Sequence, residues 1–135
     1  AMFHQRAESP LRLDGLEQAR RFFASCLAEA DPAKEHLWVA HVDDQARCLH
    51  LARHDGHADG ADLPIGEIVA DAARHGSKGL ILAHNHPSGD ATPSATDKRI
   101  TRRLALVGEA MDVAILDHLV MAGGDCRSMR QMGLL

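Results

Sequence analysis

A short apolar run near the middle of the chain limits the folds that this sequence can adopt. Residues 79–84 read GLILAH, so no polar side chain interrupts the run before His84. A half-exposed strand would alternate apolar and polar residues, whereas a short continuous run is typical of a central strand covered on both faces. We therefore expect a layered α/β fold, with a buried strand that runs directly into a histidine.

Helical patterns lie on both sides of this strand in the sequence. Apolar residues at spacings of three and four predict an amphipathic helix over residues 14–30, with Asp14 as its cap. Pro64 and Gly76 are typical of the first and last positions of a second helix. A third helix is expected from Ser94 to about residue 111, because apolar residues again fall on one side.

Strand-like runs account for most of the remaining sequence. Residues 43–45 are polar and predict a hairpin turn, while residues 54–62 are typical of an exposed loop. Besides 79–84, strands are expected over residues 36–42, 48–53, 112–116 and 118–121, with a short strand end and one helical turn within 127–135. The sequence thus predicts one α/β domain over residues 14–135, with a mixed sheet of five or six strands flanked by helices.

The composition argues against several classes of protein. The chain has 135 residues and a formal net charge of −4, so a phosphate backbone would repel it as a whole. Three Phe, one Trp and no Tyr leave little for stacking on bases. Nucleic-acid binding by this chain alone is therefore not expected. No apolar stretch approaches the roughly 18 residues of a membrane helix.

The cysteines and the N-terminus bear on location. Cys26, Cys48 and Cys126 contain no CxxC pair, which favours reduced thiols over a disulfide framework. Residues 1–13 show no signal-peptide pattern and are expected to form an N-terminal extension, in which Ala1 is typical of a tag-cleavage remnant. These features predict a cytoplasmic protein.

Two histidines follow the buried strand at a spacing that suits a metal site. His84 and His86 are two residues apart, so both side chains can project from the same face of an extended chain. Pro87 keeps His86 extended and begins a tight turn. Ser94 and Asp97 then open the next helix, where the loop can return Asp97 to the histidines. A His, His, Asp set leaves one tetrahedral position open on zinc, as a catalytic site requires.

Each part of this pattern also has a purely structural interpretation. A lone HxH is more often a pair of exposed or hydrogen-bonded histidines. Ser94 and Asp97 alone would be a helix cap with an acidic residue in the first turn, although a reciprocal capping box prefers the longer Glu or Gln. The combination within fourteen residues favours a metal site.

The same residues resemble a known family. HNHPSGD at residues 84–90, with Ser94 and Asp97, resembles the JAMM signature HxH-x7-S-x2-D of JAB/MPN metallopeptidase-like domains. The residues of this run are specifically similar to those of the RadC family of bacterial proteins. The later Asp117-His118-Leu119 and the final Gly-Leu-Leu add to this similarity. The resemblance covers about residues 33–135 and implies a JAB/MPN-like, cytidine-deaminase-like fold.

The resemblance also implies roles for individual residues. His84, His86 and Asp97 match the ligands of one zinc ion per chain, and Ser94 matches the residue that stabilises the oxyanion. The family also places a glutamate on an early strand as general base. Glu35, just after the first predicted helix, fits this role better than its competitor Glu67.

Other motifs are absent or less informative. The sequence lacks the HxE and PCxxC of zinc deaminases and the HExxH of zincins. His57, in the predicted loop, is more typical of a solvated residue. The pair Asp117 and His118 could support the site or the fold. A basic strip on the third helix is most simply a solvated face, and it consists of Lys98, Arg99, Arg102 and Arg103.

These observations predict a zinc-dependent hydrolase of the JAMM type that cleaves peptide or isopeptide bonds in a peptide or protein substrate. The alternative is a non-catalytic accessory module linked to DNA repair or mobile-element biology, in which the metal is structural. Glu35 and Ser94 favour the hydrolase, because a structural metal site would need neither.

Overall fold

The computed structural model describes residues 11–55 and 63–135, which form a five-stranded mixed sheet with the order β2-β1-β3-β4-β5. The strands are β1 (His36–Val42), β2 (Cys48–Asp55), β3 (Gly79–Asn85), β4 (Ala114–Ala122) and β5 (Asp125–Ser128). The helices are α2 (Leu16–Ala28), α3 (Ile65–His75) and α4 (Ala95–Ala110). The predicted hairpin is formed by β1 and β2, and the predicted α/β architecture is confirmed.

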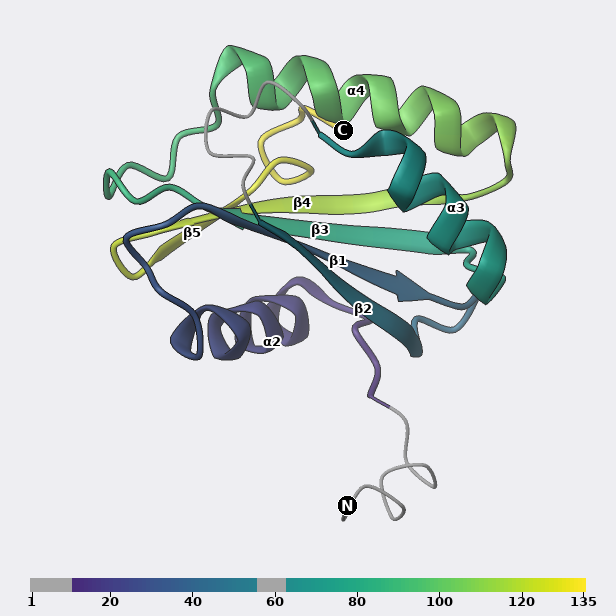
Figure 1. Ribbon diagram of the computed structural model, residues 1–135, viewed down its shortest axis with the longest axis horizontal. Coiled ribbons are helices and arrows are strands. Elements are labelled where there is room, and N and C mark those ends of the chain that lie inside the picture. Colours follow the sequence, from purple (N-terminus) through teal and green to yellow (C-terminus); the bar gives the residue numbers. More distant parts are fainter. Residues whose placement is uncertain (1–10, 56–62) are drawn as a thin grey trace.

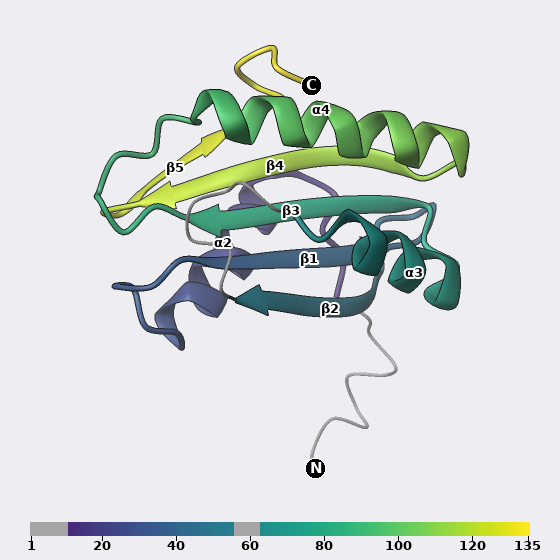
Figure 2. The ribbon, with the colours of Figure 1, turned by 45° about the horizontal axis from the view of Figure 1, so that its top comes forward.

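The apolar run at residues 79–84 forms the central strand. β3 pairs with β1 in antiparallel and with β4 in parallel orientation, and all seven of its residues are buried. Helices α3 and α4 cover one face of the sheet and α2 covers the other (Figures 1 and 2). Coverage on both faces explains why the strand has no polar alternation.

The residues of β3 alternate between two hydrophobic cores. Ile81 and Ala83 pack on the α2 side, in a core that includes Phe23. Leu80 and Leu82 pack on the opposite side, in a core that includes Leu104 of α4. The period of two along the strand therefore places His84 on the α4 side of the sheet.

The start of the first helix differs from the sequence prediction. α2 begins at Leu16, its cap residue is Gly15, and no side chain caps it. Asp14 instead lies 3.7 Å from Arg12 as an ion pair. Leu13, assigned above to the extension, is buried, and its N–H donates to Ala46 in the hairpin. The predicted boundary at Asp14 thus lies within a packed segment.

One strand stands where two were predicted. β4 is continuous because Asp117, which interrupts the apolar pattern, is satisfied within the sheet. Its carboxylate accepts hydrogen bonds from Ser128 Oγ at 2.6 Å and from the Arg130 N–H at 3.1 Å. The pairing with β3 shifts by one residue at this point, between Leu80 and Ile81. Such an irregularity is a β-bulge, and the strand continues past it.

Several smaller expectations can be compared with the structure. β2 extends to Asp55, so the predicted loop begins later, and its residues 56–62, with His57, lie outside the described residues. The same holds for residues 1–10, with Ala1. The three cysteines are free, as predicted. Among the residues described, no helix has the length and apolar character needed to cross a membrane.

Two helical glycines predict opposite effects of the same substitution. A Cβ added at Gly108 of α4 would lie 2.5 Å from the carbonyl oxygen of Val113, while one added at Gly66 of α3 would meet nothing within 4 Å. We expect Gly108→Ala to lower the free energy of unfolding by about 1–3 kcal/mol, because backbone atoms must move. Gly66→Ala should raise it by up to about 1 kcal/mol, because alanine restricts the unfolded chain. Urea denaturation measures both, and a Gly108→Ala variant as stable as the original chain would contradict the expectation.

Candidate metal centre

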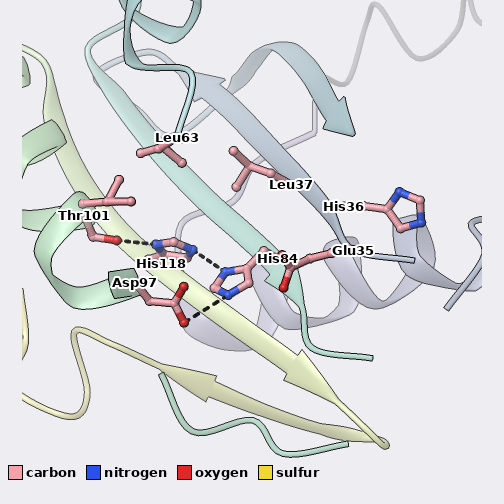
Figure 3. Close-up of a pocket in the computed structure, with 9 residues that line it drawn as sticks. Glu35, His36, Leu37, Leu63, His84, Asp97, Thr101 and His118 are labelled. Atoms are coloured by element: carbon pink, nitrogen blue, oxygen red, sulfur yellow. Dashed lines mark hydrogen bonds and ion pairs between the residues drawn. The ribbon is translucent and has the colours of Figure 1, made fainter. Parts of the chain in front are cut away.

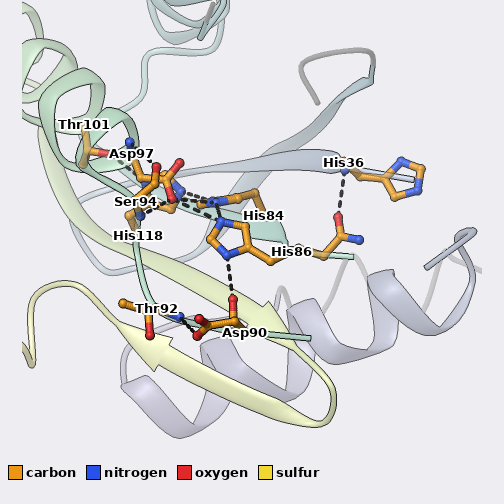
Figure 4. Close-up of polar contacts among 10 residues, drawn as sticks. His36, His84, His86, Asp90, Thr92, Ser94, Asp97, Thr101 and His118 are labelled. Carbon is orange, nitrogen blue, oxygen red and sulfur yellow. Dashed lines mark hydrogen bonds and ion pairs between the residues drawn. The ribbon is translucent and has the colours of Figure 1, made fainter. Parts of the chain in front are cut away.

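Three predicted ligands converge at the carboxyl end of β3. His84 Nε2 and His86 Nε2 lie 2.9 Å apart. Asp97 Oδ2, from the first turn of α4, lies 3.4 Å from His84 Nε2 and 3.2 Å from His86 Nε2. Figure 4 shows the loop after β3 bringing α4 back to the strand end. The turn after His86 is closed by a hydrogen bond from the Gly89 N–H to the His86 carbonyl.

The hydrogen bond of His86 Nδ1 places the single hydrogen of the neutral ring on that atom. His86 Nδ1 lies 2.8 Å from the carbonyl oxygen of Asp90, which can only accept, so Nδ1 must donate. In the neutral ring, Nε2 then carries a lone pair that faces the carboxylate of Asp97 and the ring of His84. Electron-rich atoms gathered in this way require a proton or a cation between them.

The spacing of these atoms fits a tetrahedral metal ion. Ligand atoms about 2.0–2.2 Å from a tetrahedral zinc ion lie about 3.3 Å from one another. The three separations between His84 Nε2, His86 Nε2 and Asp97 Oδ2 are 2.9, 3.2 and 3.4 Å. The donor set of the chain therefore fits zinc without large rearrangement.

Glu35 lies beside these ligands. It immediately precedes β1, and ligand atoms of Glu35, His84 and His86 all lie within 4.8 Å of one another. The position follows from the sheet, since β1 and β3 are antiparallel and Leu37 pairs with His84. The predicted base thus reaches the site, as Figure 3 shows.

Asn85 fixes the backbone on both sides of Glu35, a role that was not predicted from the sequence. Its Oδ1 accepts from the His36 N–H at 2.8 Å, and its Nδ2 donates to the Lys34 carbonyl at 2.9 Å. The Asn85 side chain is buried, and the bond from the His36 N–H is buried with it, while the bond to Lys34 is partly buried. A polar residue between two histidines at the end of an apolar strand was the available signal.

Glu67, the competitor for the base, lies elsewhere. It is in the first turn of α3, its side chain is 74% exposed, and its Oε2 lies 3.4 Å from His54 Nδ1. It does not line the pocket that contains His84.

Ser94 and Asp97 form a reciprocal capping box. The sequence had argued against one, because the aspartate side chain is shorter than the usual Glu or Gln. The Asp97 N–H donates to Ser94 Oγ at 2.9 Å, and the Ser94 N–H donates to Asp97 Oδ2 at 2.8 Å. The aspartate side chain is long enough here to accept from the Ser94 N–H. The same oxygen, Oδ2, also faces the two histidines. The structural and functional interpretations of this pair therefore hold together.

His118 lies behind His84, away from the converging ligands. Its Nε2 lies 2.7 Å from His84 Nδ1, and its Nδ1 lies 2.7 Å from Thr101 Oγ1. Asp117 instead binds Ser128 and Arg130 near the end of the chain. The pair that the sequence left undecided thus divides, with His118 at the site and Asp117 in the sheet.

These residues line a pocket with one apolar side (Figure 3). The apolar part consists of Leu37, Leu63 and Ile100. The remaining lining residues are Glu35, His36, His84, Asp97, Thr101 and His118.

Comparison with known proteins identifies the family of the chain. The family model described as the RadC-like JAB domain matches residues 13–134. The chain belongs to the RadC-like JAB domain family. Among curated relatives, a UPF0758 protein of Vibrio parahaemolyticus is 38% identical over 131 residues, which cover 94% of this chain and 58% of the relative. A UPF0758 protein of Chloroflexus aggregans is 37% identical over 102 residues, which cover 75% of this chain and 44% of the relative.

The RadC-like chain spans about half the length of the curated relatives it matches. A third relative, a UPF0758 protein of Bordetella petrii, is 39% identical over 119 residues, which cover 86% of this chain and 51% of the relative.

Electrostatics keep Asp97, the acidic candidate ligand of this RadC-like domain, ionised. Burial acts to raise the pKa of Asp97, but the hydrogen bond of His84, the positive charge that His84 carries when it is protonated, and the hydrogen bonds with Ser94 outweigh it. The pKa of Asp97 is therefore well below its usual range. Burial also holds the pKa of His118 well below its ordinary value, which keeps that ring neutral.

The basic strip lies apart from these groups, along α4. Arg99, Arg102 and Arg103 are exposed and Lys98 is half-buried.

The shared role of Asp97 predicts a difference between two variants. Asp97→Asn keeps an oxygen that accepts from the Ser94 N–H, whereas Asp97→Ala loses it and should lower the free energy of unfolding by about 1 kcal/mol more. The pKa of Asp97 is lower in the folded than in the unfolded chain, so its stabilisation is present above about pH 4 and is lost below it. Asp97→Asn should flatten this acid dependence. Urea denaturation of metal-free protein at several pH values measures both effects. If Asp97→Asn and Asp97→Ala lowered the free energy of unfolding equally, the expected difference between them would be contradicted.

Proposed function

We propose that this RadC-like domain binds one zinc ion through His84, His86 and Asp97 and hydrolyses peptide or isopeptide bonds. The observation that carries the proposal is the triangle of ligand atoms, whose sides of 2.9, 3.2 and 3.4 Å match tetrahedral coordination. Three protein ligands leave one position open, which is typical of catalytic rather than structural zinc.

The chemistry divides between the metal ion and the chain. A zinc ion held there would polarise a scissile carbonyl and lower the pKa of a water molecule. Glu35 accepts the proton of the attacking water and later delivers it to the leaving amine. Its carboxylate suits this role because the Asn85 side chain holds the backbone on both sides of it.

Ser94 supplies the hydrogen bond that an oxyanion needs. Its Oγ accepts from the Asp97 N–H through one lone pair and keeps its own hydrogen to donate. A donor fixed by a helix cap requires little reorganisation when negative charge develops on the substrate oxygen.

The apolar side of the pocket favours a substrate with a hydrophobic part. Leu37, Leu63 and Ile100 offer this surface next to the ligands, and excluding water there strengthens the polar interactions of the reaction. We assign a peptide or protein as the substrate class. The three free thiols support a reducing compartment such as the cytoplasm.

Metal content tests the site without a substrate. Protein purified without chelator should contain about one zinc per chain. His84→Ala should lose it, because two remaining ligands hold zinc too weakly, and Glu35→Gln should retain it. Elemental analysis and zinc titration measure this, and a chain that takes up no zinc even when zinc is supplied would contradict the site.

Activity separates the two glutamates. Glu35→Gln should lower the rate of hydrolysis by at least about 100-fold, because glutamine cannot accept the proton. Glu67→Gln, an exposed change away from the pocket, is the matched control and should leave the rate unchanged. The assay uses libraries of fluorogenic peptides and of peptides joined through a lysine side chain. Full activity in Glu35→Gln would remove Glu35 from the mechanism.

A further inference from the structure

A buried chain of hydrogen bonds leads away from His84 on the side opposite the ligand triangle. It runs from His84 Nδ1 through the His118 ring to Thr101 Oγ1, and both contacts are 2.7 Å long. The exposed fractions of His84, His118 and Thr101 are 7%, 3% and 1%. With water excluded from the ring of His118, the three residues themselves determine where the hydrogens lie. Figure 3 shows the two contacts as dashed lines.

With both rings neutral, the chain can carry its hydrogens in two directions. In the first, His84 Nδ1–H donates to His118 Nε2, and His118 Nδ1–H donates to Thr101 Oγ1. His84 Nε2 then has a free lone pair. In the second direction, the Thr101 hydroxyl donates to His118 and His118 donates to His84, so that the hydrogen of His84 sits on Nε2. Only the first direction allows His84 to act as a ligand through Nε2.

We propose that His118 and Thr101 are positioning residues that hold His84 in the form whose Nε2 can bind a metal ion. The proposal rests on the zinc site described above. Thr101 Oγ1 lies 2.7 Å from His118 Nδ1 and has lone pairs that can accept its hydrogen, which completes the first direction.

The two strands and the helix place this chain without help from the metal. His118 lies on β4 beside Leu82 of the parallel strand β3, two residues before His84 on the same face. Thr101 is one turn after Asp97 on α4, so both project from the same side of the helix. A single helix thus supplies a ligand and the residue that orients another ligand.

Zinc affinity in a matched pair of variants tests the proposal. Thr101→Val keeps the shape and removes the hydroxyl, and it should weaken zinc binding by about 10- to 100-fold, as measured by competition with a chelator. Thr101→Ser keeps the hydroxyl and should bind zinc close to the original affinity. Equal affinity in the original chain and in Thr101→Val would overturn the proposal. If the original chain also failed to bind zinc, the zinc site on which this proposal rests would itself be overturned.

A spectroscopic measurement tests the same inference without a variant. In the metal-free chain, at a pH where both imidazoles are neutral, ¹⁵N NMR should place the hydrogen of His118 on Nδ1 and that of His84 on Nδ1. A purely structural role for His118 would not fix this direction. A hydrogen on His118 Nε2 in the metal-free protein would overturn the proposal even if Thr101→Val failed to fold.

Discussion

β3 is covered by helices on both faces, and its neighbours β1 and β4 satisfy its backbone on both edges. A strand covered on both faces and paired on both edges can present residues to a site only at its ends, and the site lies at its carboxyl end. The chain leaves the core there at His84 and Asn85, with the histidine on the α4 side and the asparagine against the start of β1. The candidate ligand His84, the hydrogen bonds of Asn85 on both sides of Glu35 and the turn that leads to α4 all lie at this end of the strand.

The carboxylate of Asp97 links the stability of the fold to the candidate site. The same Oδ2 atom accepts the Ser94 N–H and faces both histidines. The amino end of a helix favours negative charge, so α4 helps to keep this carboxylate ionised and in place. A candidate ligand that also caps a helix is oriented by the cap itself, because turning the side chain away would cost the helix its capping hydrogen bonds.

Sequence patterns predicted the parts of this molecule in which a local signal and the tertiary structure agree. The run at residues 79–84, the hairpin and the helix that begins after Ser94 all have strong local signals, and HxH with Ser-x-x-Asp has a chemical one. The errors have tertiary causes. Asp14 was predicted to cap α2 but pairs with Arg12, and the strand through Asp117 was divided because its partners, Ser128 and Arg130, lie more than ten residues away. Asn85 and His118 were not assigned for the same reason, since each acts through a residue that only the sheet brings close.

The one-residue irregularity in β4 decides which layer His118 belongs to. Before it, Val113 and Ile115 pack in the core on the α3 and α4 side. After it, Leu119 and Met121 pack in the opposite core, beside α2, so that the even-numbered His118 reaches His84. The bulge therefore exchanges the faces: odd-numbered residues face α3 and α4 before it, and even-numbered residues do so after it. Substitutions in β4 do not change which residues face α4. Deletion of one residue at the bulge would exchange the two faces for every later residue of β4. The strand could still form, but His118 would then point away from His84.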